Sequence, residues 1–284
     1  MRKNIKLSII TINLNNKDGL EKTINSVVSQ TFKDYEYIVI DGASSDGSCK
    51  IIQKYKNDIT HWVSEKDSGV YNAMNKGIKV ARGKYLQFLN SGDYLLNKEV
   101  LKKVFNIITN KDIYYGSSLR KSETGNLYEF TEPSDLSFKR FFDYSICHQS
   151  MFIKRKLFRE FGTYDESLKI VSDWKFNVNA IILNNCPLNF LNFPIVFYDT
   201  KGISSKKRKL STREKNNCMK NMIPPRILID YIKNNINSDN DMNNFKYEIL
   251  VLKNNLNIIQ SSKFYKFWQS YNNILKKYKF KRAS

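Results

Sequence analysis

Apolar residues follow two alternating patterns over the first 110 residues of the chain. Short runs rich in β-branched and aromatic side chains predict buried strands at residues 5–12, 35–40, 60–63 and 85–89. Between them, apolar residues recur three or four positions apart, as in Val70, Met74 and Ile78, and predict amphipathic helices; Ser68 is the expected cap of this one. Such alternation predicts an α/β fold with a mostly parallel central sheet flanked by helices.

The pattern is less regular after residue 112. It predicts strands at 113–117, 145–153 and 192–198, and helices at 155–161 and 173–183. At residue 206 a basic run begins, and segments rich in Asn, Lys, Ile and Tyr follow it. We therefore predict a sheet domain at 1–205, with halves at 1–110 and 111–205, and a basic helical C-terminal extension at 206–284.

Composition narrows the class of protein. The 284 residues are 41% hydrophobic and 13% aromatic, so a globular chain with a substantial core is expected. It contains no run of eighteen apolar residues and no visible signal peptide, which predicts a cytoplasmic protein. The four cysteines lack metal-binding spacing and are expected to be free thiols. A net charge of +20 favours polyanions, anionic substrates or an acidic membrane surface as partners.

Several common nucleotide and hydrolase motifs are missing. No G-x-G-x-x-G follows the first strand, which argues against a dinucleotide-binding domain. The sequence also lacks the G-x-x-x-x-G-K-[ST] loop of P-loop enzymes and the G-x-S-x-G elbow of α/β hydrolases.

Carboxylates instead follow the predicted strands. They are Asp41, Asp46, Glu65, Asp67, Asp93 and, later, Asp173. Carboxylates on separate loops at one sheet edge can hold a divalent cation that bridges nucleotide phosphates. Any one of them can equally cap a helix or stabilise a turn. The combination of Asp41, Asp67 and Asp93 favours a nucleotide site at that edge.

Three stretches carry a resemblance to a known family: S-I-I-T-I-N-x-N, Y-I-V-I-D-G-A-S-S-D-G-S and E-K-D-S-G-V-Y-N-A-M-N-K-G-I-x-x-A-R-G-K-Y-L-Q-F-L-N-S-G-D. They resemble family 2 glycosyltransferases of the Rossmann-like GT-A fold, similar to the colanic-acid and other surface-polysaccharide transferases of bacteria. The later H-Q-S-M-F-I-K-R, Y-D-E-S-L-K-I-V-S-D-W and K-G-I-S-S fit the same family. The resemblance covers about residues 7–205 and leaves the tail uncovered.

The resemblance implies a donor site for a nucleotide-sugar, most simply a UDP-sugar, in the first half, and an acceptor site in the second. The implied donor residues are Thr11, Asn13, Asp41, Asp46, Asp67, Asn72, Lys76, Asn90 and Ser91. Thr11 and Asn13 would contact the uracil or ribose, and Asp41 the base with Asp46 beside it. The diphosphate and sugar pocket would be lined by Asp67, Asn72 and Lys76.

The resemblance also implies a metal ion, Mn²⁺ or Mg²⁺. Asp93 would be the metal-binding member of the family's D-x-D motif, in which Asn90 replaces the first carboxylate. Because an amide oxygen binds such a cation less strongly than a carboxylate, we expect the donor phosphates to hold much of it.

Asp173 matches the family's catalytic carboxylate, which implies an inverting transfer in which it acts as general base. His148, Gln149 and Trp174 are the implied acceptor residues. From the residues alone, Asp173 can also be a helix cap, His148 a packed structural residue and Trp174 part of the core.

The tail interleaves aromatic and basic side chains at 264–268 and 276–282, a composition that suits an anionic membrane surface or RNA. The resemblance favours the membrane, with a glycan or polyprenyl-linked acceptor at its cytoplasmic face, a peripheral location and no specific nucleic acid. A solvated helix packed on the sheet domain is the plain alternative.

Two other functions compete with sugar transfer. A catalytically decayed scaffold that binds polyanions or nucleic acid is favoured by Asn90 and the positive charge. Nucleotidyl transfer would also use a nucleotide-binding parallel sheet, but its G-x-G-T-R loop is absent. We therefore predict a glycosyltransferase of surface-polysaccharide synthesis.

Overall fold

A computed structural model describes residues 5–122, 124–200, 202 and 207–235 of the chain, together with residues 262, 267 and 270. The chain divides into two compact units, residues 1–218 and 219–284. Apart from Phe267, the predicted aromatic and basic tail segments lie outside the described residues. Within the described part, no helix is long and apolar enough to cross a bilayer.

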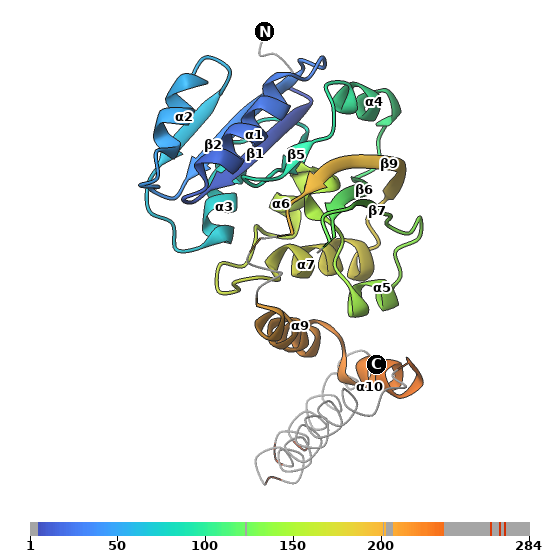
Figure 1. Ribbon diagram of the computed structural model, residues 1–284. Helices are drawn as coiled ribbons and strands as arrows, with labels where there is room; N and C mark the ends of the chain where they lie inside the picture. Colours follow the sequence, from blue (N-terminus) through green and yellow to red (C-terminus); the bar gives the residue numbers. More distant parts are fainter. Residues whose placement is uncertain are drawn as a thin grey trace, which may run out of the picture. The chain divides into compact units, whose positions relative to one another are not determined.

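The first half alternates strands and helices as the pattern predicts (Figure 1). Its elements are β1 (Leu7–Asn13), α1 (Lys17–Val28), β2 (Tyr35–Asp41), α2 (Ser48–Lys54), β3 (His61–Ser64), α3 (Val70–Val80) and β4 (Tyr85–Phe88). The four strands pair in parallel in the order β3-β2-β1-β4. Their carboxyl ends therefore meet at one edge of the sheet, where open α/β sheets bind ligands.

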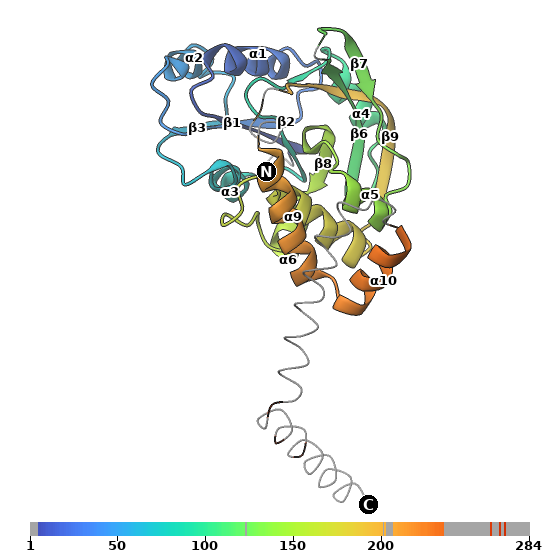
Figure 2. The ribbon, with the colours of Figure 1, turned by 60° about the horizontal axis from the view of Figure 1, so that its bottom comes forward.

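Strand β1 is buried along its whole length because both of its faces are covered. On one face, Leu7 and Ile9 join the core with α1 residues such as Leu20 and Ile24. On the other face, Ile10 packs against α3. Figure 2 shows this layering, with α1 and α2 on one side of the strands and α3 on the other. Alternate side chains of a strand point to opposite faces, so a run that is apolar throughout fits a covered central strand.

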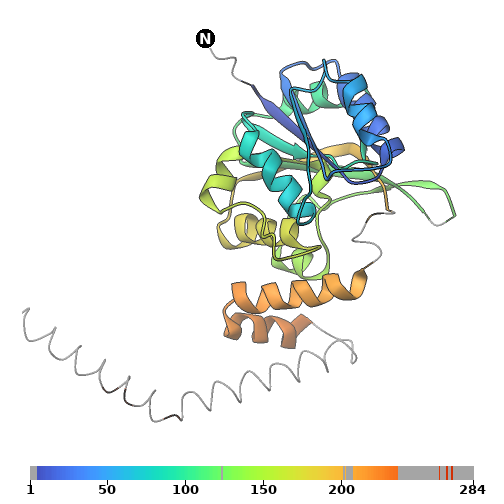
Figure 3. The ribbon, with the colours of Figure 1, turned by 90° about the vertical axis from the view of Figure 1, so that its left-hand side faces the viewer.

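The second half is a mixed extension of the same sheet. Its elements are β5 (Tyr94–Leu95), α4 (Val100–Ile107), β6 (Ile113–Lys121), β7 (Leu127–Phe130), α5 (Phe138–Asp143), η1 (His148–Ser150), β8 (Met151–Lys154), α6 (Arg155–Glu160), α7 (Ser172–Asn177), η2 (Val178–Leu183), β9 (Leu188–Tyr198) and α9 (Arg208–Met222). The order continues β4-β8-β6-β9-β5, and β7 pairs with β6 in a hairpin that projects from the body in Figure 3. Of these pairings only β6 with β9 is parallel.

The structure corrects three local expectations. Ser68 does not cap α3, which begins after Gly69; its N–H instead donates to the side chain of Asn72. The predicted strand at 145–153 is only Met151–Lys154, because residues 148–150 form a turn of 3₁₀ helix. The predicted helix at 173–183 is an α-helix that changes to a π-helical turn at Val178.

Gly77 allows α3 to lie close against β1. A Cβ atom at this position would come within 2.4 Å of Ile10 Cγ2, inside the buried layer. We expect Gly77→Ala to destabilise the protein, because overpacking costs about 1–3 kcal/mol and outweighs a helix-propensity gain of up to about 1 kcal/mol. Urea unfolding measures the change. The control is Lys79→Ala on the exposed face of the same helix, expected to stay within about 0.5 kcal/mol; a Gly77→Ala protein as stable as the parent would contradict the packing.

Candidate active site

The ends of β1, β2 and β3 meet around one buried carboxylate, Asp41. Its Oδ1 accepts from Asn13 Nδ2 at 2.7 Å and Ser44 Oγ at 2.6 Å, and its Oδ2 from Ser64 Oγ at 2.6 Å. Burial alone would raise the pKa of Asp41, but these hydrogen bonds hold that pKa below its ordinary value. Asp41 is fully covered, so the free acceptor atom here is Asn13 Oδ1, which is buried with no partner among the described residues.

Two predicted donor residues lie beside this cluster in different surroundings. Thr11 is fully buried, and its hydroxyl lies 3.0 Å from that of Tyr37 in the core. Asp46 is exposed and accepts from the N–H of Lys17 at 2.8 Å and the hydroxyl of Ser48 at 2.6 Å. The hydrogen bond from Ser48 lowers the pKa of Asp46 below its ordinary value. A surface hollow of about 270 Å³ is lined by Asn15, Asn16, Lys17, Asp18 and Asp46.

The start of α3 carries the next group of predicted residues. Lys76 Nζ lies 2.6 Å from Asp67 Oδ1 and 2.8 Å from Glu65 Oε1. Asn72 Nδ2 donates to Glu166 Oε2 at 2.8 Å. The ammonium of Lys76 is therefore balanced by two carboxylates, and Asn72 ties the donor half to the loop that precedes α7.

Asp93 lies in the turn after β4, where each of its two carboxylate oxygens accepts one hydrogen bond. Its Oδ2 accepts from Gln149 Nε2 at 2.8 Å and its Oδ1 from the N–H of Asp199 at 2.8 Å. It is only 4% exposed, and burial raises the pKa of Asp93 to about 7. Gln149, predicted as an acceptor residue, therefore holds the turn after β4 through its hydrogen bond to Asp93. Ser91 packs in the same turn, where its carbonyl accepts from Asn16 Nδ2 at 2.9 Å.

The described residues do not fit a metal centre built on Asp93. Hard divalent cations bind oxygen atoms that are open to them, whereas the Asp93 side chain is covered and each of its oxygens faces an N–H donor of the protein. No group of three His, Cys, Asp or Glu side chains suited to a metal occurs in the described part of the chain. The buried oxygen of this turn without a hydrogen-bond partner in that part is Asn90 Oδ1.

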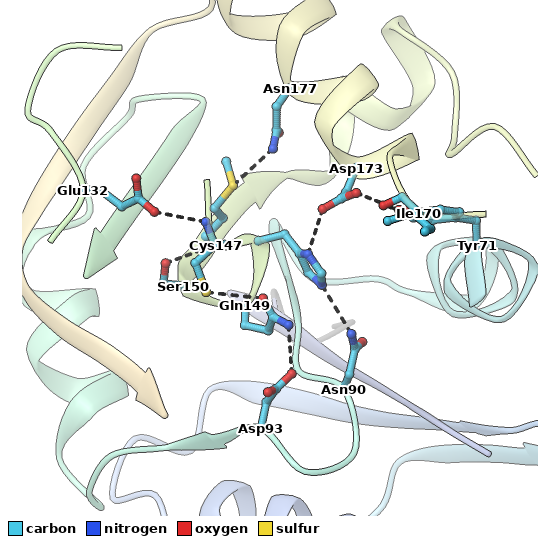
Figure 4. Close-up of polar contacts among 12 residues, drawn as sticks. Tyr71, Asn90, Asp93, Glu132, Cys147, Gln149, Ser150, Ile170, Asp173 and Asn177 are labelled. Atoms are coloured by element: carbon cyan, nitrogen blue, oxygen red, sulfur yellow. Dashed lines mark hydrogen bonds and ion pairs between the residues drawn. The ribbon is translucent and has the colours of Figure 1, made fainter. Parts of the chain in front are cut away.

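Asp173 is the centre of a second buried cluster, drawn in Figure 4. Its Oδ1 accepts from the hydroxyl of Tyr71 at 2.7 Å, and its Oδ2 lies 2.9 Å from Nδ1 of His148. On the far side of the imidazole, Nε2 lies 3.4 Å from Asn90 Nδ2. The cluster thus joins α3, the 3₁₀ turn, α7 and the turn after β4. Through that turn it lies next to the sheet edge where the parallel strands end.

Asp173 and His148 each favour the charged form of the other. Burial would raise the pKa of Asp173, but the hydrogen bond and charge of His148 and the hydroxyl of Tyr71 hold it below its ordinary value. Burial would lower the pKa of His148, yet the hydrogen bond and charge of Asp173 raise it. An ionised carboxylate only accepts hydrogen bonds, so Nδ1 of His148 carries the proton between them.

The 3₁₀ turn explains how His148 reaches this position. The N–H of Ser150 donates to the carbonyl of Cys147 at 3.0 Å, and its hydroxyl to the same carbonyl at 2.8 Å. An extended strand would point His148 and Ser150 to the same face. The turn instead places Ser150 inward and leaves the imidazole beside Asp173.

Trp174 is covered, with 1% of its surface exposed. Its indole N–H donates to the carbonyl of Phe141 at 2.8 Å, and Lys215 Nζ lies 5.4 Å from its ring centroid. The ring is therefore not open to a sugar in this structure, and its role in acceptor binding stays a prediction. Burial lowers the pKa of Lys215 to about 8.

Sequence reasoning missed two residues that belong to these clusters. Tyr71 lies within the long central motif, and the signal was a polar hydroxyl on the first turn of a helix whose other inward residues are apolar. Glu166 accepts from Asn72 and Asn75 at 2.8 Å each; it lies within the quoted Y-D-E-S-L-K-I-V-S-D-W stretch, but nothing there pointed to a contact with α3.

Residues 8–162 match the family described as glycosyl transferase family 2. The chain belongs to glycosyltransferase family 2. A glycosyltransferase of PGL/p-HBAD biosynthesis from Mycobacterium bovis is 29% identical over 201 residues, covering 69% of this chain and 77% of that protein. An uncharacterised glycosyltransferase from Mycobacterium tuberculosis is 30% identical over 207 residues, covering 71% and 78%.

Solved structures share the fold of this family 2 glycosyltransferase. TarS of S. aureus in complex with UDP-GlcNAc superposes with a TM-score of 0.62 at 19% identity, over 84% of this chain and 69% of that chain. The mannosyltransferase PcManGT from Pyrobaculum calidifontis, in complex with GDP-Man and Mn²⁺, gives a TM-score of 0.53 at 12% identity, over 94% and 84%. The predicted family and GT-A fold are confirmed. The finer resemblance to colanic-acid enzymes stays a prediction.

In this family 2 glycosyltransferase, Asp93 is expected to matter for stability rather than for metal binding. Asp93→Ala leaves the N–H groups of Gln149 and Asp199 unpaired and should destabilise the protein by about 1–3 kcal/mol. Asp93→Asn should stay closer to the parent, because the amide of Gln149 can turn to accept from it. Urea unfolding measures both, and calorimetry with and without Mn²⁺ measures nucleotide binding. If Mn²⁺ strengthens nucleotide binding by the parent protein but not by Asp93→Asn, Asp93 is a metal ligand after all.

The pair of His148 and Asp173 predicts a pH dependence of stability. The folded pKa of His148 is raised, so its contribution is full below its ordinary value of 6.5 and is lost as pH rises through the folded pKa. The folded pKa of Asp173 is lowered, so its contribution is present above 3.8 and lost as pH falls through the folded pKa.

We therefore expect His148→Gln to destabilise the protein more at pH 5 than at pH 9. Urea unfolding at both pH values measures the difference. His61→Gln, on exposed β3, is the matched control. A loss that is equal at the two pH values, or larger at pH 9, would contradict the ion pair.

Proposed function

We propose that this chain transfers a sugar from a UDP-sugar to a hydroxyl of a glycan or lipid-linked glycan, with inversion at the anomeric carbon. The observation that carries the proposal is the buried carboxylate of Asp173, held ionised by Tyr71 and His148 beside the turn that follows β4. A charged carboxylate at the ligand-binding edge of the sheet is a suitable proton acceptor.

The donor would lie along the carboxyl ends of β1, β2 and β4. Asn13 Oδ1 and Asn90 Oδ1 are buried acceptors without partners in the described part of the chain, and polar groups in such a position are suited to ligand donors. The imide N–H of uracil suits the first, and a sugar hydroxyl suits the second. The UDP-GlcNAc bound by TarS supports a uridine nucleotide.

Asp173 would act as the general base. Two of its roughly four lone-pair positions are used by Tyr71 and His148, which leaves room for the acceptor hydroxyl. As the acceptor oxygen attacks the anomeric carbon, its proton passes to Asp173, and the bond to the nucleoside diphosphate breaks on the opposite face. One such displacement inverts the anomeric configuration. A positioned base contributes about 10²–10⁴ in rate.

A decayed scaffold that binds polyanions is the second candidate. It is favoured by the burial of Asp93, the amide at position 90 and the net charge of +20. It predicts salt-sensitive binding of nucleic acid and no turnover of a nucleotide-sugar.

The predicted contact of the basic tail with an anionic membrane on the cytoplasmic side is a separate proposal. The tail segments that would make it lie outside the described residues, apart from Phe267.

Nucleotide binding tests the donor. We expect UDP to raise the unfolding temperature more than GDP or dTDP, because the inferred donor is a UDP-sugar. The effect is large enough to measure, since a ligand at a hundred times its dissociation constant adds about 2.7 kcal/mol to stability. A thermal-shift titration of the full chain with each nucleotide, with and without Mn²⁺, measures this. If no nucleotide shifts the transition and RNA does, the decayed scaffold replaces the enzyme.

Replacement of Asp173 tests the chemistry. Asp173→Asn should keep UDP binding within about threefold of the parent, because the inferred uracil site lies at Asn13 and Asp41. The same variant should lower turnover of the UDP-sugar by about 10²–10⁴. Release of UDP measures turnover. The matched control is Asp58→Asn, the same change at an exposed carboxylate. Full turnover by Asp173→Asn would show that Asp173 is not the general base.

A further inference from the structure

Helix α9 begins inside the segment predicted as an extension, yet its residues 208–218 belong to the first compact unit, residues 1–218. Glu214 of this helix is 8% exposed. Its Oε1 accepts from the backbone N–H of Lys169 at 2.9 Å, and its Oε2 from that of Ile170 at 3.0 Å. A buried carboxylate is stable only when its charge is met by such donors, so the side chain is fixed to the loop before α7.

The loop passes this constraint to the catalytic carboxylate. The hydroxyl of Tyr71 lies 2.5 Å from the carbonyl of Ile170 and 2.7 Å from Asp173 Oδ1, so its single proton is shared between these two acceptors. The N–H held by Glu214 and the carbonyl held by Tyr71 belong to one residue. A shift of Ile170 therefore moves the hydroxyl that orients Asp173.

We propose that Glu214 is a positioning residue for Asp173, acting through Ile170 and Tyr71. The inference rests on the proposed role of Asp173 as the base. It assigns part of α9 to the catalytic unit, and it makes residues 207–218 necessary for turnover rather than an appendage to it.

The chemistry of the contact requires a carboxylate of this length. Its two oxygens meet two successive N–H groups, and a glutamine would turn an N–H donor toward one of them. An aspartate keeps the charge but is one methylene shorter, so it can reach only one N–H without a shift of the helix.

The other end of the loop has its own support. Lys175 Nζ lies 2.6 Å from Asp165 Oδ2, and Asn75 Nδ2 donates to the carbonyl of Tyr164 at 2.8 Å. Loss of the Glu214 contact should therefore loosen residues 169–170 and leave the rest of the fold in place.

The test uses the full chain and two readouts. Glu214→Gln should lower kcat for UDP-sugar turnover by about 10–100-fold, because a displacement of about 1 Å near the chemistry costs up to about 10²-fold, with UDP affinity unchanged. Since the charge of Asp173 helps raise the pKa of His148, the same variant should lower that pKa, measured by NMR. The protein has only two histidines, so His61 serves as the internal reference.

A double-mutant cycle separates positioning from general stability. If Glu214 acts through Tyr71, then Glu214→Gln added to Tyr71→Phe should lower kcat little further than Tyr71→Phe alone. Glu214→Asp should recover part of the loss. Arg213→Gln, at the exposed neighbouring position of α9, is the control and should match the parent.

The outcomes are distinct. Parental kcat and His148 pKa in Glu214→Gln, or losses that add fully with those of Tyr71→Phe, would overturn the inference and leave the proposed function intact. Full turnover by Asp173→Asn would overturn the proposed base and this inference with it. If Glu214→Gln does not bind UDP or fold, Glu214→Asp gives the same two readouts, and parental values there would also overturn the inference.

Discussion

The cost of burying the charge of Asp173 governs how this molecule is assembled. A carboxylate that is mostly withdrawn from water needs donors close to both oxygens, and here they come from α3 and from the 3₁₀ turn before β8. These segments belong to the two halves of the sheet domain, so neither half can complete the cluster alone. The same hydrogen bonds therefore fix the geometry of the site and hold the two halves together. Any change that separates α3 from α7 exposes an uncompensated charge as well as a broken interface.

The first half was predictable from the sequence because each signal there is local. A run such as Leu7–Asn13 is apolar throughout and has one good solution, a strand covered on both faces. Parallel strands then bring their ends together without further information. That is why Asn13 and Asp41 were expected at one edge and are found there, 2.7 Å apart between Nδ2 and Oδ1.

The second half and the finer roles depend on contacts between distant residues. Tyr71 and Asp173 are 102 positions apart, and no pattern in either segment announces the pairing. The hydrogen bonds of Asp93 come from Gln149 and the backbone of Asp199, so its sequence motif could suggest a metal ligand while its surroundings supply N–H donors. The strand expected at 145–153 failed for a local reason, since a serine hydroxyl competes with strand pairing for the nearby carbonyl. The motifs pointed to Asp173 and His148 separately, but no pattern pointed to their contact or to Tyr71.

The pairing of β5 with β9 has a consequence for synthesis of the chain. Tyr94 and Leu95 find their partners only at Phe197 and Val196, and Asp93 receives its backbone donor 106 residues later. At roughly 5–20 residues per second, a ribosome needs about 5–20 s to deliver that partner. During this interval Tyr94 and Leu95 lack their strand partner and Asp93 lacks its backbone donor, whereas β4 receives its partner β8 earlier, at residues 151–154. An open edge of this kind is a template for wrong pairing. The β5 edge therefore stays open to wrong pairing until β9 has emerged, and a chaperone that shields this edge would act in that window.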